Sequence, residues 1–355
     1  MTGNKAPRHK FYLGLIGTIA LLCGSLAPLN SQSQARAPQD RSKGVQSVKP
    51  TKLERTALRP LPDLSIQKYP TAARTLTFPG SRSWGGIVVT DQPVFQFPEN
   101  DTAGWTTQAM GTVKVPPNKF VTFCPSFTFF DNPHGLDKLP PDAFDSVLLH
   151  FMAMEDKDNG KGDRALAALN HFRTIRSIDC NKAEISDEGL SQIKDLQELE
   201  SLNLFSTEVK GTFLKNLSGC RKLRFIDLAH TSLDPHNLQY LQQFKALQKL
   251  GLMRTGAKGS TLKPLGQCSN LESLDLAYNP DVDDTLVQAL KPLKKLKFVR
   301  VRDTSISDKG LKELNALGIH ATRELSKSPK TVSPNAREEQ AKKHDIERIL
   351  APISR

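Results

Sequence analysis

The sequence lacks the short motifs that mark common catalytic sites. Neither HExxH, nor GxSxG, nor a GxGxxG that follows a strand occurs among its 355 residues. Such motifs place a nucleophile, a base or a metal ligand at fixed spacing, and the histidines and acids of this chain show no such spacing. The sequence therefore predicts no catalytic residues, although a triad assembled from distant segments stays open at this stage.

The body of the chain also has little excess of either charge. The net charge is +12, of which residues 1–60 contribute +8 (10 basic minus 2 acidic) and the remaining 295 residues +4 (39 minus 35). A nucleic-acid-binding domain concentrates basic residues on a folded face. Because most of the excess precedes the predicted folded region, we expect no nucleic-acid partner.

The N-terminus has the pattern of an export signal. Lys5, Arg8 and Lys10 precede an apolar run over 11–22, followed by small and polar residues up to Ala35. This pattern predicts a signal peptide over 1–35 and a chain that is secreted or held in the periplasm or cell envelope. Membrane contact is expected only if the segment stays uncleaved, since 11–29 is nearly long enough to span a bilayer. Residues 36–65, which contain four prolines, are expected to form a flexible linker.

Apolar residues recur every 24 residues between about 150 and 320. Each repeat opens with apolar residues at positions 1, 4 and 6, typical of a short buried strand, and closes with an apolar helix face near positions 16, 19 and 22. One strand and one helix cannot bury both faces alone, so stacked copies must complete the core. The period predicts an α/β solenoid over 144–322 with a parallel sheet and about seven repeats. The clearest repeats begin at Leu199, Leu223, Leu247, Leu271 and Leu296.

The segments LESLNL, LRFIDL, LQKLGL, LESLDL and LKFVRV closely resemble leucine-rich repeats, most of all the short bacterial type. The resemblance covers roughly half the chain. It implies a curved solenoid with the sheet on the concave side and short helices outside, and a non-catalytic scaffold that binds a protein partner. It also implies that side chains at position 9 hydrogen-bond the backbone of the turn. Those side chains are Thr207, Thr231, Thr255, Asn279 and Thr304.

The cysteines are predicted to be buried, free thiols. Cys220 and Cys268 occupy the same helix position two repeats apart, so their Cα atoms should lie about 9–10 Å apart, beyond the ~7 Å that a disulfide bridges. Cys180 falls at a strand core position and Cys124 in an apolar run. None has the close pairing of a zinc site, so we expect no metal and no cofactor.

Strand side chains alternate between faces, so positions 3 and 5 should face the concavity, continued by positions 7 and 8. Aromatic, Met and Arg residues at these positions form a mixture that is enriched at protein interfaces, and we take them as the candidate partner-binding patch. The alternative is that they pack among themselves, or under a cap or the tail. The patch comprises Phe205, Phe225, His230, Met253, Arg254, Tyr278, Phe298, Arg300 and Arg302.

The segments on either side of the repeats have different compositions. Residues 66–143 contain short β-rich runs and are expected to form a small β unit that covers the open end of the solenoid. The alternative is an independent ligand-binding or enzymatic domain, for which Trp84 and Trp105 would be the residues to inspect. Residues 323–355 are expected to form a polar tail with a short helix.

The stretch DKDNGKGD, from Asp156 to Asp163, imitates the start of a calcium loop. Glycine, lysine and alanine stand where ligands or the loop glycine belong, so a calcium site is not expected. The period instead places Phe151, Met154 and Asp156 at positions 1, 4 and 6 of a degenerate first repeat. It puts Asn159 at position 9, and it aligns Asp163 with Asp187 and Asp308 at a helix N-cap.

Overall fold

The structure, a computed structural model, describes residues 72–91 and 104–323. The predicted signal peptide, the linker and nearly all of the predicted tail lie outside these residues. Within the described ranges, no helix is long and apolar enough to cross a membrane.

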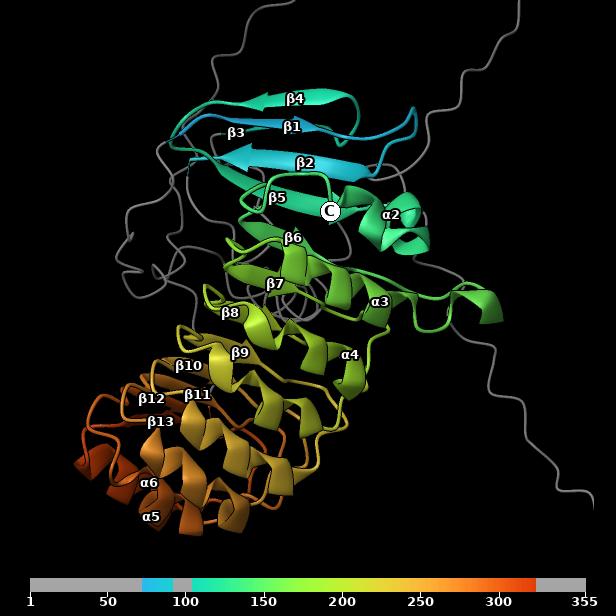
Figure 1. Cartoon of the computed structure of the whole chain (residues 1–355). Coiled ribbons are helices and arrows are strands. Elements are labelled where there is room, and N and C mark those ends of the chain that lie inside the picture. The colour runs from blue at the N-terminus through green and yellow to red at the C-terminus, as the bar shows by residue number, and fades with distance from the viewer. Residues whose placement is uncertain (1–71, 92–103, 324–355) are drawn as a thin grey trace, which may run out of the picture.

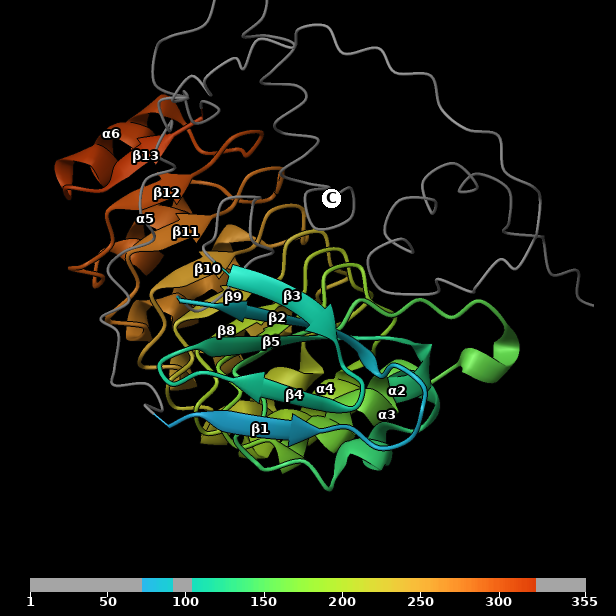
Figure 2. The same cartoon turned by 90° about the horizontal axis from the view of Figure 1, so that it is seen from above.

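In this part of the chain, one sheet of eleven strands carries the fold, and short helices cover one of its faces (Figure 1). All neighbours from β5 to β13 pair in parallel, as strands joined through helices do. Seen from above, these strands follow an arc (Figure 2). They are β5 (Phe120–Pro125), β6 (Ser146–Leu148), β7 (Ser177–Asp179), β8 (Ser201–Asn203), β9 (Phe225–Asp227), β10 (Lys249–Gly251), β11 (Ser273–Asp275), β12 (Phe298–Arg300) and β13 (His320–Thr322).

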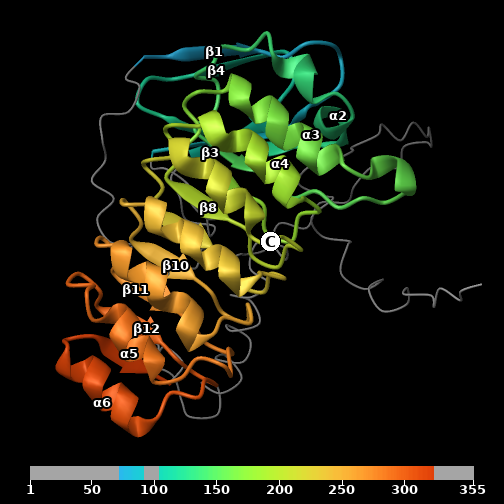
Figure 3. The same ribbon diagram turned by 60° about the horizontal axis from the view of Figure 1, so that its bottom comes forward.

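The helices line up along the outer side of the stack (Figure 3). Their apolar positions are buried against the sheet, as Leu238, Leu241, Leu262 and Leu265 show at 0% exposure. The α-helices of the repeats are α3 (Lys161–Ala168), α4 (Asp187–Ser191), α5 (Thr285–Leu290) and α6 (Asp308–Ala316). The 3-10 helices of the repeats are η2 (Asp156–Asp158), η3 (Leu169–His171), η4 (Gln192–Asp195), η5 (Thr212–Gly219), η6 (Pro235–Gln243) and η7 (Gly259–Gln267).

The strand pairing follows the predicted period. Ser177 pairs with Ser201, Ser201 with Phe225, and Phe225 with Lys249, each 24 residues later. The side chains at position 4 are all buried, because they face the helices. The curved α/β solenoid predicted from the sequence is therefore confirmed.

The side chains at repeat position 9 hydrogen-bond the backbone of the turns, as predicted. The Thr255 hydroxyl donates to the Leu252 carbonyl at 2.8 Å, and the other threonines of this column repeat the contact. Asn279 does more, because its Nδ2 donates to the carbonyls of Leu252 and Leu276 while its Oδ1 accepts from the Thr255 and Ala257 amides. Asn279 therefore joins two successive repeats.

Replacing Asn279 with alanine should destabilise the solenoid by about 2–4 kcal/mol, because several buried backbone groups lose their partners at once. Replacing Thr304, which makes one such bond, should cost about 1 kcal/mol. Urea unfolding followed by circular dichroism measures both. Equal losses for the two variants would show that the bridge between repeats contributes nothing.

The predicted register of the first repeat is wrong. Ser146 pairs with Ser177, 31 residues later, so the first repeat is seven residues longer than the others. The extra residues follow the strand and form a projecting segment, in which Met154 is 64% exposed and Asp156 begins η2. Val147 and Leu149 fill the core positions that were assigned to Met154 and Asp156.

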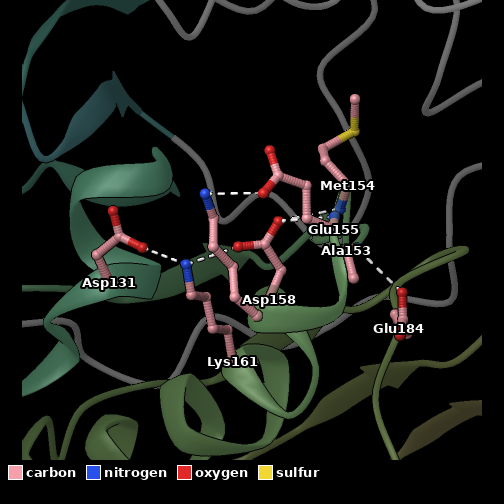
Figure 4. A network of polar contacts seen from close by, with 8 residues as sticks. Asp131, Ala153, Met154, Glu155, Asp158, Lys161 and Glu184 are labelled. Atoms are coloured by element: carbon pink, nitrogen blue, oxygen red, sulfur yellow. Dashed lines mark hydrogen bonds and ion pairs between the residues drawn. The ribbon is translucent and has the colours of Figure 1, made fainter.

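Within DKDNGKGD, the Asp158 side chain is held by groups of the surrounding chain (Figure 4). The Asp158 carboxylate accepts from the amides of Met154 and Glu155 and, at 2.7 Å, from Lys161 Nζ. Its hydrogen bond with Lys161 is the largest influence that lowers the pKa of Asp158. Lys161 also pairs with Asp131. The stretch folds around this lysine, and Asn159 is not part of the position 9 column.

The predicted N-caps lie inside the helices, one residue past the N-cap of α4 and α6 and three residues past that of α3. Ser186 and Ser307 cap α4 and α6 with their hydroxyls. Asp163 lies in the first turn of α3, and its carboxylate accepts from the Ser186 amide at 2.8 Å and hydroxyl at 2.6 Å. Asp284 makes the same pair of bonds to Ser307. These acids therefore connect the helix of one repeat to the N-cap residue of the helix in the next repeat.

The β-rich N-terminal segment extends the solenoid sheet. Strand β5 pairs with β6 in parallel and with β2 (Gly85–Thr90) in antiparallel fashion, and β3 (Gly104–Gln108) forms the outer edge. A separate ribbon of β1 (Arg74–Thr77) and β4 (Thr112–Val115) lies beside it. The helices α2 (Phe127–Asp131) and η1 (Pro133–Leu136) complete the unit.

Aromatic rings fill the junction between this unit and the repeats. Phe123 of β5 stacks on Phe144 with ring centres 4.6 Å apart, and Phe130 of α2 lies 4.6 Å from Phe151. Trp84 is buried, and its Nε1 donates to the Pro79 carbonyl. The two parts of the chain thus share one core.

Candidate functional site

The concave face carries the predicted patch, but its members differ in exposure. Phe298 is 40% exposed and Phe225 and Met253 are half-buried, whereas Phe205 is only 8% exposed. Arg254 is exposed. Phe205 therefore offers little surface, and the accessible aromatic area lies at Phe225 of β9, Phe298 of β12 and the half-buried Tyr278 after β11.

The structure brings the patch residues together in small groups. The rings of Phe205 and His230 lie 5.0 Å apart. The guanidinium carbons of Arg254 and Arg302 lie 5.3 and 5.5 Å from the centre of the Tyr278 ring, a cation–π arrangement. Phe298 also contacts His320, at 5.8 Å between ring centres, and Arg300 forms an ion pair with Asp275.

Repeat position 8 has a left-handed backbone. His230, Arg254 and Tyr278 have φ angles of 58°, 53° and 61°, which cost non-glycine residues about 1 kcal/mol or more each. Each amide donates to a position 7 carbonyl of the next repeat, at 2.7 to 2.9 Å, and this bond holds the turn. The turn sets these three side chains at the ends of the strands, beside the sheet face.

Asp227 is the concave residue whose acidity the fold changes most clearly. Burial raises the pKa of Asp227 from 3.8 to about 6, and the negative charges of Asp275 and Asp179 act in the same direction. The Ala229 amide and the charge of Arg300 act against this increase. Near neutral pH the side chain therefore holds a negative charge that the folded chain disfavours.

Replacing Asp227 with asparagine should stabilise the protein at pH 7 by roughly 2 kcal/mol, after allowance for partial exposure. Because the pKa is higher in the folded state, the aspartate penalty is absent below about pH 4, grows as the pH rises to 6, and is complete above that. Urea unfolding at pH 4 and pH 7 measures this. The free energies of unfolding of the two proteins should differ at pH 7 and be equal at pH 4. A difference that does not change with pH would contradict the raised pKa of Asp227.

The described cysteines are buried and form no disulfide, as predicted. Burial raises the pKa of the Cys220 thiol to about 12 and that of Cys268 to about 11, and it raises the pKa of Cys180 as well. A nucleophilic cysteine needs a thiolate near neutral pH. These thiols pack as small apolar side chains.

The sequence prediction missed the acids beside the patch. Asp179, Asp227 and Asp275 stand at position 5 in three of the repeats, and this recurrence was the available signal. Across the described residues, no three His, Cys, Asp or Glu side chains gather as metal ligands would. The acids are instead spread along the sheet, one to a strand.

Comparison with known proteins bears on the repeats. A family model described as Leucine Rich repeat matches residues 267–290, which include β11 and α5. An internalin from Listeria monocytogenes has a similar structure, with 13% identity and a TM-score of 0.37 over 51% of this chain and 54% of that one. Internalin C2 from the same organism has 19% sequence identity and a TM-score of 0.31, over 47% of this chain and 80% of that one. No curated protein matches the sequence.

The matched repeat and the constant pairing of strands 24 residues apart agree with each other. Residues 267–290 match a leucine-rich repeat, and the repeats that precede them in the stack follow the same period.

Proposed function

We propose that the chain is an exported, non-catalytic scaffold that recognises a protein partner through its concave face. The accessible aromatic surface of Phe225 and Phe298, with Met253, Tyr278 and the arginines beside it, is the observation that carries the proposal. Aromatic residues and arginine dominate the binding energy of protein interfaces. Leucine-rich repeats generally serve as interaction scaffolds, which supports the same function.

The test compares what two double variants capture. Phe225→Ser with Phe298→Ser removes concave aromatic surface, and Gln239→Ser with Lys263→Ser alters exposed residues on the helical side. Each tagged protein is incubated with an extract of the producing cells, and bound proteins are quantified by mass spectrometry. Because a hot-spot residue contributes about 2 kcal/mol, the concave variant should lose at least about tenfold of a specific partner. If both variants retain every captured protein equally, the concave face is not the binding surface.

The N-terminal segment 66–143 is proposed to be the cap of the solenoid. Its pairing of β5 with β6 and the shared aromatic core support this role. The runner-up function, an exported effector or enzyme with its activity in this segment, would use accessible side chains there. Trp105, 38% exposed on β3, would be the first of these to test, whereas Trp84 is buried.

A further inference from the structure

A group of basic side chains lies along the edge of the solenoid where each helix ends and the next strand begins. Arg221, Lys245 and Lys294 stand four residues before β9, β10 and β12, so the strand register places them at the same point of their repeats. Lys295 follows Lys294, and Lys291 comes directly after α5. All five are exposed. We call these five residues the basic rim.

Hydrogen bonds connect the basic rim across repeats. Lys295 Nζ donates to Asn270 Oδ1 at 2.6 Å, and Asn270 Nδ2 donates to the Lys245 carbonyl at 2.7 Å. Asn270 therefore holds the Lys295 side chain close to the backbone of Lys245. Lys294 Nζ lies 3.5 Å from the Lys291 carbonyl. The positive charges thus follow one edge of the solenoid from β9 to β12.

The basic rim lacks acidic partners. Among the residues that the structure describes, none of its five cations forms an ion pair. Neighbouring basic residues do: Lys222 Nζ lies 2.7 Å from a Glu198 oxygen. Arg224 is likewise paired with Glu200 at 3.5 Å. Cations that share one edge without counter-charges repel one another, and a bound anion would remove this repulsion.

The helix dipole accounts for only part of the basic rim. A cation at the C-terminal end of a helix is stabilising, but the effect is confined to the last turn. Lys291, at the C-cap of α5, fits this role. Lys294 and Lys295 come four and five residues after the last residue of α5, so its dipole does not explain them. Their charge is available to a ligand.

We propose that the basic rim binds an acidic segment of the partner protein that occupies the concave face. The inference rests on the proposed function and adds the charge of the partner. Arg221 and Lys294 are three repeats apart, or about 14 Å at the spacing of the strands, which an extended segment of about five residues spans. Phe298 stands four residues after Lys294 and contributes accessible aromatic surface. One partner can therefore cover both, with a segment rich in Asp or Glu beside the part that meets Phe298.

The experiment measures binding of a fluorescein-labelled ten-residue peptide of alternating glutamate and serine to the full chain by fluorescence polarisation. The same peptide with glutamine in place of glutamate is the matched ligand control. At low salt, the wild-type protein should bind the glutamate peptide at least about fivefold more tightly than the glutamine peptide. Lys291→Ser with Lys294→Ser and Lys295→Ser, the rim variant, should abolish that preference. High salt should abolish it in the wild type, because salt screens exposed charges.

A control variant removes the same number of charges elsewhere on the surface. Lys114→Ser with Lys138→Ser and Lys263→Ser replaces three exposed lysines outside the basic rim and should keep the preference. Both variants should melt at the temperature of the wild type, since every replaced side chain is exposed. No preference in the wild type, a preference that persists in the rim variant, or equal losses in the two variants would overturn the inference.

Two further measurements separate this inference from its alternatives. Vesicles of phosphatidylserine and phosphatidylcholine in equal parts are a second probe, in a sedimentation assay. Binding to these vesicles that is tighter than to the glutamate peptide and lost in the rim variant would overturn the assignment to a protein partner. If Phe225→Ser with Phe298→Ser loses the captured partner while the rim variant keeps it, this inference fails and the proposed function stands.

Discussion

Replacing Arg74 with methionine is expected to lower the free energy of unfolding by about 3–5 kcal/mol, because it leaves a buried carboxylate unpaired. Arg74 is 5% exposed and donates to Asp145 Oδ2 at 2.8 Å and to the carbonyls of Asp142 and Lys119. Asp145 in turn accepts from the Val121 amide of β5 at 2.7 Å. The pair therefore connects β1, β5 and the first repeat, and its loss should loosen the cap from the solenoid.

Two further variants make this prediction specific. Lys222→Met removes an exposed ion pair with Glu198 and should cost at most about 1 kcal/mol. Adding Asp145→Asn to Arg74→Met removes the unpaired charge while keeping an acceptor for Val121, so it should recover a large part of the loss. Urea unfolding of all three measures the differences. If Arg74→Met costs no more than Lys222→Met, the pair does not hold the cap in place.

Residues 66–143 produced alone should not fold. Without β6, strand β5 loses its parallel neighbour, and Phe123 and Phe130 lose the rings of Phe144 and Phe151. A segment of this size that exposes its aromatic core has too little buried apolar surface to offset the entropy of folding. A proton NMR spectrum without dispersed amide signals and a melt without a cooperative transition are the expected results.

A folded fragment would have the opposite meaning. Dispersed signals together with specific affinity for a ligand would favour the alternative function, in which the segment acts by itself as an effector or enzyme. The variant Trp105→Ala would then locate the site, because Trp105 is accessible on β3 whereas Trp84 packs inside the unit. Loss of ligand affinity in this variant would place the site at the outer edge of the sheet.

The repeats could be predicted in detail because their signal is local and repeated. Apolar positions 4 and 6 alternate within a strand, and a period of 24 sets every later strand in register. The first repeat could not be placed, because an insertion of seven residues breaks the period where the pattern is weakest. Phe151 is buried like a repeat residue, but it follows the strand β6 instead of opening it.

The cap was predictable in composition and not in topology. Its β-rich runs indicated strands, but which strands pair is decided by contacts distant in sequence. The parallel pair of β5 with β6 and the buried pair of Arg74 with Asp145 are of this kind. Arg74 also has no local sequence signal, because a buried arginine is recognised only by its partner.

The candidate site was predictable as a surface and not in its energetics. Alternation placed the aromatic patch on the concave face, but exposure depends on neighbours, and Phe205 is buried where exposure was expected. Asp227 became notable only when the fold surrounded it with Asp179 and Asp275 and set its carboxylate over Gly251. No pattern within one repeat contains that information, since it arises from the stacking of five repeats.

The claim that the concave face is the recognition surface is tested most directly by site-specific photo-crosslinking in the producing cells. A photoreactive phenylalanine replaces Phe225 or Phe298 on the concave face, or Gln239 or Lys263 on the helical side. We expect one shared, discrete adduct from the two concave positions and none from the helical ones. Adducts from the helical positions alone, or the same adducts from all four, would contradict the claim.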